Sequence, residues 1–92
     1  MNSSNPTVKN EAVYAQIIED IFVERLVQDF KFGAQHTHSD EHWLTILAEE
    51  FGEVAREVYE NKEDTTSLQS ELVQVAAVAV AWLEALEQRS KV

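Results

Sequence analysis

The chain of 92 residues contains no cysteine, only two glycines and a single proline. Without cysteine, disulfides and thiolate metal sites are excluded. The scarcity of glycine and proline favours long helices over hairpins and tight turns. Apolar residues make up 45% of the chain and charged residues 26%, which is typical of a globular protein. A chain of this length is expected to form one small domain with a limited core.

Basic residues are also scarce, with seven Lys and Arg against seventeen Asp and Glu, for a net charge of −10. Binding to a phosphate backbone requires a basic surface, so this charge argues against DNA or RNA as a partner. A single nucleotide carried with Mg²⁺ is not excluded, because the metal supplies positive charge.

Long hydrophobic runs are missing too. The longest nearly unbroken apolar run, residues 75–83, is too short to span a bilayer. Residues 1–6 contain no basic segment followed by an apolar run, so they do not resemble a signal peptide. We therefore expect a soluble cytoplasmic protein that has no membrane partner.

Apolar residues recur at helical spacings in three segments, namely residues 7–31, 39–61 and 66–88. Gly33 is a natural stop for the first helix, and Ser39 or Asp40 is a suitable N-cap for the second. Thr66 and Gln69, at capping-box spacing, are expected to open the third. The short loop between the second and third helices makes them antiparallel neighbours. We expect residues 1–6 to be a disordered lead-in and residues 7–92 to form a single helical domain.

The third helix is apolar on nearly every side. Its expected core arc consists of Leu68, Leu72, Val75, Ala76, Val78, Ala79, Trp82, Leu83 and Leu86. Apolar character continues around the opposite side at Val73, Ala77, Val80 and Ala81. A helix that is apolar all round is buried on both sides, and three helices are too few to cover it. The prediction is an all-α, antiparallel bundle of about three long helices, completed by oligomerisation as a homodimer or homotetramer.

Glutamates interrupt the apolar face of the second helix. Successive helical residues rotate by about 100°, so Glu50 falls about 20° from Trp43, within the arc expected to face the core. Glu53 lies one turn further along the flank of this arc. A charge in such a place costs several kcal/mol unless it is paired or bound to a metal. Gly52 lies between them, and a glycine inside a helix often marks close approach by another backbone or a ligand.

The third helix repeats this anomaly. The same rotation puts Glu71 between Val78 and Trp82, with Gln74 one turn away on the flank. Three carboxylates and an amide oxygen between two helices suit Mg²⁺ or Mn²⁺. A metal-bound water deprotonated by Glu49 is a plausible nucleophile. The alternative is that these glutamates are ordinary surface charges, because pairs of Glu are common on helix surfaces.

The chain resembles the MazG-like, all-α nucleoside triphosphate pyrophosphohydrolases. Their pattern is E-E-x-x-E on one helix and E-x-x-D on the next, and here these read Glu49-Glu50-Phe51-Gly52-Glu53 and Glu71-Leu72-Val73-Gln74. The resemblance covers roughly residues 20–87 and implies helical dimers or tetramers. It further implies cleavage of a nucleotide between its α and β phosphates, which gives a monophosphate and pyrophosphate. The resemblance also implies a nucleotide pocket lined partly by the end of the first helix, and Mg²⁺ bound by Glu50, Glu53, Glu71 and Gln74.

One position departs from the family pattern, because Gln74 stands where the family has Asp. Gln still offers a carbonyl oxygen, but the lost negative charge should weaken Mg²⁺ binding. One alternative is therefore a catalytically weak or inactive helical oligomer that binds a nucleotide or a protein. Another is a purely structural oligomer whose buried glutamates pair with Arg25 or Arg56.

Four residues near the end of the first helix are candidates for substrate binding. Lys31 could contact a phosphate, although Lys is equally expected at a helix C-terminus because of the helix dipole. Phe32 could stack on a base, with packing the more expected role. Gln35 could bond a base edge if it is not simply a solvated loop residue, and Arg25 could reach phosphates across a subunit boundary. We interpret the neighbouring histidines as solvated rather than as zinc ligands: His36, His38 and His42.

Overall fold

The computed structural model describes residues 6–33, 37–60 and 63–91, with side chains from residue 10 onward. These residues form three α-helices and no strand: α1 (Pro6–Phe32), α2 (Asp40–Glu60) and α3 (Thr65–Ser90). The all-α class and the three long helices are therefore confirmed. Pro6 belongs to α1, where a proline is well tolerated in the first turn. Residues 1–5 of the expected lead-in, together with Gln35 and His36, lie outside the described residues.

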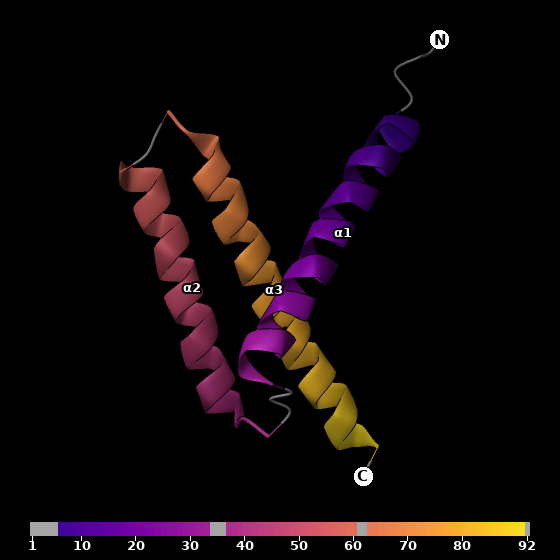
Figure 1. The fold of residues 1–92 in the computed structure, drawn as a ribbon, viewed down its shortest axis with the longest axis vertical. Coiled ribbons are helices and arrows are strands. Elements are labelled where there is room, and N and C mark those ends of the chain that lie inside the picture. Colours follow the sequence, from indigo (N-terminus) through magenta and orange to yellow (C-terminus); the bar gives the residue numbers. More distant parts are fainter. Residues whose placement is uncertain (1–5, 34–36, 61–62, 92) are drawn as a thin grey trace.

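The helices are arranged as a hairpin that a third helix crosses (Figure 1). Helices α2 and α3 run antiparallel, and α1 crosses α3 with its C-terminal half while its N-terminal half points away from the hairpin. The radius of gyration is 15.9 Å, and the molecule measures 51 × 36 × 21 Å. A compact chain of this length would have a radius of gyration of about 12 Å. The single chain is therefore an open arrangement of helices.

The first two helix boundaries follow the predicted signals. Gly33 has φ of 75°, a left-handed conformation that L-residues avoid, and its N–H donates to the Asp29 carbonyl at 2.8 Å. Ser39 caps α2, because its Oγ accepts from the His42 N–H at 3.1 Å.

The start of α3 differs from the prediction. Asp64 is the N-cap, with its carboxylate accepting from the Thr66 N–H at 2.9 Å. The expected capping box of Thr66 and Gln69 is therefore wrong. The helix begins at Thr65 because Asp64 already provides the acceptor that the first turn needs.

The buried core is small and rich in alanine. Its buried apolar residues are Trp43, Val54, Ala77, Val78, Ala81 and Ala85. The expected core arc of α3 is wrong in part, because three of its leucines are 40 to 64% exposed: Leu72, Leu83 and Leu86. Instead, Ala77 and Ala81 from the opposite side are buried. Alanine allows close approach of neighbouring helices, and both α2 and α1 pack against α3.

A polar contact ties the start of α2 to the end of α3. The Asp40 carboxylate accepts from Trp82 Nε1 at 2.9 Å and from Arg89 Nη2 at 2.8 Å. The hydrogen bonds from Arg89 and Trp82 lower the pKa of Asp40. This contact closes the lower end of the hairpin, beside the main apolar cluster of Trp43, Val78, Ala81 and Ala85.

Two local features bear on the sequence interpretation. A Cβ added at Gly52 would meet no atom within 4 Å, so the close approach expected there is not found within the described part of the chain. Helix α3 is long and apolar enough to cross a membrane by length and composition. Core helices of soluble proteins share this composition, so it is weak evidence for a membrane span.

Candidate functional site

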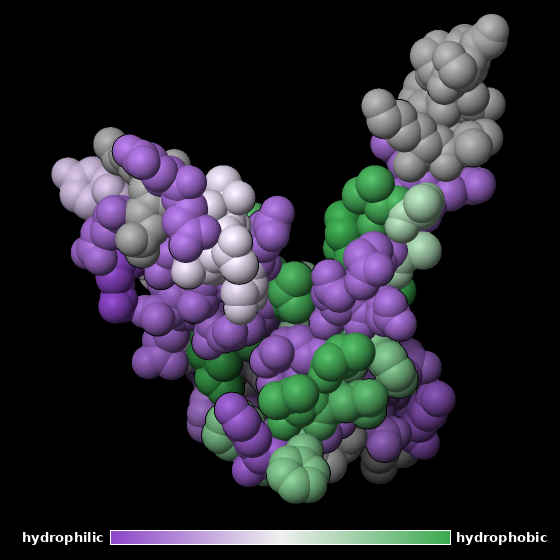
Figure 2. Space-filling view, turned by 45° about the horizontal axis from the view of Figure 1, so that its top comes forward, coloured by the Kyte–Doolittle hydropathy of each residue, from purple (hydrophilic) through white to green (hydrophobic). Residues whose placement is uncertain are grey.

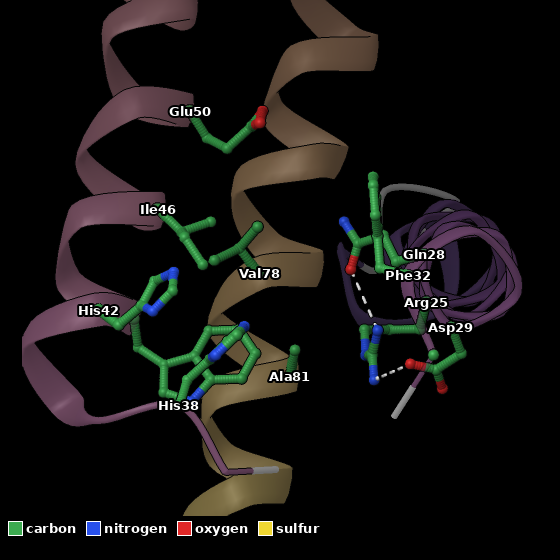
Figure 3. Close-up of a pocket in the computed structure, with 12 residues that line it drawn as sticks. Arg25, Gln28, Asp29, Phe32, His38, His42, Ile46, Glu50, Val78 and Ala81 are labelled. Carbon is green, nitrogen blue, oxygen red and sulfur yellow. Dashed lines mark hydrogen bonds and ion pairs between the residues drawn. The ribbon is translucent and has the colours of Figure 1, made fainter. Parts of the chain in front are cut away.

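Two carboxylates lie partly buried between α2 and α3. Glu50 Oε1 and Glu71 Oε2 are inaccessible to solvent and have no hydrogen-bond partner among the described residues. Figure 3 shows the Glu50 side chain reaching from α2 toward α3. A buried oxygen without a donor is costly, so each of these atoms calls for a partner that the described part of the chain does not supply.

The surroundings of Glu50 make its negative charge unfavourable. Burial raises the pKa of Glu50, and the negative charges of Glu71, Glu53, Glu24 and Glu49 raise it further. These charges come from all three helices. Glu24 on α1 was not among the predicted site residues, because only the crossing of α1 over α3 brings it near the other carboxylates.

Glu71 has a similar environment. Burial raises the pKa of Glu71, as do the charges of Glu53 and Glu57, whereas Arg56 lowers it. Gln74, one turn along α3, is half-buried. The negative charges of carboxylates on facing helices therefore raise the pKa values of Glu50 and Glu71. The helical rotation predicted that these two residues face inward.

The arginines do not neutralise these two glutamates directly. Arg56 forms an ion pair with Glu53, and both side chains are well exposed. Arg25 is 8% exposed and bonds other carboxylates. Among the described residues, neither Arg25 nor Arg56 bonds the buried oxygens of Glu50 and Glu71, so the structural alternative that pairs the buried glutamates with these arginines is not met at Glu50 or Glu71.

Beside the acidic cluster lies a pocket of about 380 Å³. All three helices and the segment before α2 contribute to its walls, and Glu50 is part of its lining. The side chains drawn and labelled in Figure 3 show apolar, aromatic and polar groups around one space. Its lining residues include Arg25, Gln28, Asp29, Phe32, His38, His42, Trp43, Ile46, Glu50, Val78 and Ala81.

One wall of the pocket is aromatic. The rings of His38 and His42 stack with centroids 4.0 Å apart, and His38 meets Trp43 edge-on at 4.9 Å. Burial and the charge of His42 lower the pKa of His38, which favours a neutral ring. Trp43 Nε1 is buried with no acceptor among the described residues. The interpretation of these histidines as solvated missed this wall, because it forms only where the segment before α2 turns back over the helix.

The opposite wall is built around Arg25 on α1. Its Nε donates to Glu84 Oε1 at 2.6 Å, its Nη1 to Gln28 Oε1 at 3.1 Å and its Nη2 to Asp29 Oδ1 at 3.1 Å. Burial lowers the pKa of Arg25, but the bonds and charges of Glu84 and Asp29 raise it overall. Arg25 was predicted as a substrate-binding residue, and it lines the pocket of its own chain.

The remaining predicted site residues lie in different places. Phe32 lines the pocket at the end of α1, whereas Lys31 is exposed and is not among the lining residues. Glu49 is exposed next to Glu50 on α2. Gln35 lies outside the described residues. The structure thus brings Arg25, Phe32 and Glu50 around one pocket.

The donor atoms suit a divalent cation in kind. The partnerless oxygens of Glu50 and Glu71 are hard ligands of the type that Mg²⁺ prefers. Within the described residues, no three or more His, Asp or Glu side chains lie close enough together to hold a metal ion.

No protein-family model, curated protein or solved structure matches this chain. The functional inference therefore rests on the motifs of the sequence and on the geometry and charge of this site.

Proposed function

We propose that the protein is a cytoplasmic, Mg²⁺-dependent nucleotide pyrophosphohydrolase of the MazG-like type. It would cleave a nucleoside triphosphate into a monophosphate and pyrophosphate. The observation that carries this proposal is the pair of carboxylate oxygens on Glu50 and Glu71 that are buried and have no hydrogen-bond partner in the part of the chain that the structure describes. A purely structural role would be better served by pairing them with a cationic side chain, and the nearby arginines bond other carboxylates.

The cation ligands in this proposal are Glu50, Glu53, Glu71 and Gln74, with Mg²⁺ or Mn²⁺ as the ion. Glu53 would exchange its exposed ion pair with Arg56 for the cation, a small loss because exposed pairs contribute only about 0–1 kcal/mol. When bound, the ion would supply positive charge to the phosphates and lower the pKa of a water.

Glu49 is the proposed general base. It is exposed next to Glu50 on α2, so it is accessible to a water molecule at the edge of the acidic cluster. In the reaction, water attacks the α phosphorus and loses a proton to Glu49. The bond from this phosphorus to the oxygen that bridges it to the β phosphate breaks, and pyrophosphate leaves.

The nucleoside would occupy the pocket next to the acidic cluster. Its volume of about 380 Å³ falls within the range of small-molecule sites. Phe32 and the wall of His38, His42 and Trp43 provide aromatic surfaces for a base, and Arg25 provides hydrogen-bond donors. With the base in this pocket, the phosphates would lie toward Glu50. Lys31 and Gln35 are proposed as further contacts of the nucleotide.

A panel of nucleotides tests this function. Each nucleotide is incubated with the protein and Mg²⁺ or Mn²⁺, and the release of pyrophosphate is measured. We expect release from at least one nucleotide, reduced roughly 100-fold or more by Glu50→Gln, because the substitution removes one of the ion's charged ligands. Glu11→Gln, which removes an exposed charge from α1, is the matched control. The proposal fails if no nucleotide yields pyrophosphate and Glu50→Gln changes neither metal binding nor stability.

A catalytically weak or inactive oligomer that binds a nucleotide or a protein is the second candidate. Gln74 favours it, because a neutral amide replaces the expected fourth carboxylate beside Glu71. Gln74→Asp separates the two candidates. If the wild-type protein is inert and Gln74→Asp gains Mg²⁺-dependent release of pyrophosphate, the binding function is favoured. If the wild-type protein is active, the amide is a sufficient ligand.

A further inference from the structure

Helix α1 carries an uncovered apolar strip on the side that faces away from α3. We call it the outer face of α1, and it consists of Phe22, Val23, Leu26, Val27 and Phe30. These side chains are 60, 51, 53, 38 and 93% exposed, respectively. They recur at spacings of three and four residues, so they share one side of the helix. The buried Arg25 and half-buried Gln28 occupy the opposite side, toward α3. A hydrophobic patch is visible in the lower half of the space-filling view (Figure 2).

The outer face is toward the upper end of the sizes that the largest apolar patches of monomeric proteins reach. Its exposed side-chain surface amounts to roughly 500 Å² per copy, with two phenylalanines contributing most. Paired with an equal surface it would bury about 1,000 Å², near the lower limit for a specific protein interface. Among the described residues, only six other apolar residues are buried, and three of them are alanines. The missing apolar burial is therefore of the kind that an association between chains supplies.

We infer that a second copy of this chain covers the outer face, through a two-fold symmetric, antiparallel pairing of α1 with α1 of the partner. The face is self-complementary, because a phenylalanine lies four residues to either side of Leu26. A two-fold axis at Leu26 sets Phe22 of one copy against Phe30 of the other and Leu26 against itself. A closed dimer of this type uses the same surface on both copies.

The charges along α1 favour the antiparallel direction. Glu19 and Asp20 precede the outer face, and Lys31 follows it. An antiparallel pair brings Lys31 of one copy to the acidic end of the other, whereas a parallel pair would place the acidic ends together. Each copy carries a net charge of −10, so the two copies repel each other overall. Dimerisation should therefore become tighter as salt screens this repulsion.

The first test is the mass of the particle in solution, measured by light scattering after size exclusion and by sedimentation. We expect twice the chain mass of 10.5 kDa for the wild-type protein. Leu26→Glu should give monomers that retain their helical circular dichroism. Leu83→Glu is the matched control, because Leu83 is an exposed leucine on α3, and it should remain dimeric. None of these measurements requires a metal or a nucleotide, so the result is independent of the proposed activity.

The second test uses the absence of cysteine from the chain, and it also applies if Leu26→Glu does not fold. Helix axes in contact lie about 8–10 Å apart, so a short bis-maleimide spans two cysteines across the axis. Leu26→Cys should cross-link to itself, and Phe22→Cys should cross-link to Phe30→Cys when the two are mixed. Leu83→Cys should not cross-link.

A wild-type monomer, or an oligomer that Leu26→Glu leaves intact, would overturn the inference. Efficient cross-linking of Phe22→Cys to itself would overturn the antiparallel direction. A tetramer that Leu26→Glu reduces to dimers would support the pairing, with a second interface elsewhere on the chain.

Discussion

The substitution Glu50→Gln tests the acidic cluster through the stability of the protein, without any nucleotide. Gln keeps the size of the side chain and removes its charge, so the repulsion among Glu50, Glu71 and Glu24 is relieved. The Gln amide also brings N–H donors into a region where Glu71 Oε2 has no partner. Most substitutions of partly buried residues destabilise a protein. Here we expect the opposite, namely that the metal-free variant is more stable than the wild-type protein at neutral pH.

The magnitude follows from the burial of one oxygen atom. A buried polar atom without a partner costs about 1–3 kcal/mol, and more if it is charged. Because the Glu50 side chain is only partly buried, solvent screens the rest of the charge, and we expect a gain of about 1 kcal/mol in the free energy of unfolding. For a chain of this size, such a gain raises the melting temperature by about 4–8 °C.

The pH dependence of this difference has a defined sign. The pKa of Glu50 is raised in the folded protein above its ordinary value of 4.5. Between the two values the folded state binds more protons than the unfolded state, so stability falls as pH rises through this window. The destabilisation is fully present above the raised pKa and absent below about 4.5. The two proteins should therefore differ most at neutral pH and converge as pH falls toward 4.5.

Thermal melting followed by circular dichroism measures these effects. Wild type, Glu50→Gln and the Glu11→Gln control are compared at pH 7.5 and pH 5, first with a chelator and then with Mg²⁺. A ligand that binds only the folded state raises the melting temperature, so Mg²⁺ should stabilise the wild-type protein more than Glu50→Gln. If Glu50→Gln melts at or below the wild-type temperature in chelator at pH 7.5, the reasoning about the cluster is refuted.

Three further substitutions test the framework around the site. Arg25→Met should lower the free energy of unfolding by about 2 kcal/mol in urea denaturation, because it leaves carboxylates in the α1–α3 contact without their cation; unchanged stability would contradict this role. Gly33→Ala should cost about 1 kcal/mol, because φ of 75° is unfavourable for alanine, and an equal melting temperature would argue against this helix end. Trp82→Phe should cost about 1 kcal/mol by losing the bond to Asp40, and no loss in the same assay would show that this bond contributes nothing.

The number and type of the helices could be predicted because apolar spacing and capping residues are local signals. The side of α3 that is buried could not. Leu72 and Leu83 looked like core residues, yet they are exposed, whereas Ala77 and Ala81 are buried. The contact is decided by how closely two helix backbones approach, and small side chains allow the closest approach. A prediction from hydrophobicity alone ranks leucine above alanine, and it therefore assigned the wrong residues of α3 to the core.

The same distinction, between local sequence signals and contacts that depend on helix packing, applies to the site. The inward positions of Glu50 and Glu71 follow from helical rotation and a short loop. The partner of Arg25 could not be found in this way, because Glu84 lies 59 residues further along the chain. Likewise, Glu24 and the His38–His42 wall belong to the site only through the crossing of α1 and the path of the segment before α2. These contacts depend on the angle between helices, for which the sequence contains no local signal.

Helix α1 connects the proposed site with the proposed interface. It packs mainly against α3, and it carries Arg25 and Phe32 of the pocket wall as well as Glu24 beside the acidic cluster. A partner that covers the outer face would hold α1 from its other side. Since a helix moves as a rigid unit, fixing the outer face also fixes the pocket wall on the inner face. Loss of the dimer in Leu26→Glu should therefore weaken nucleotide binding even though Leu26 points away from the pocket.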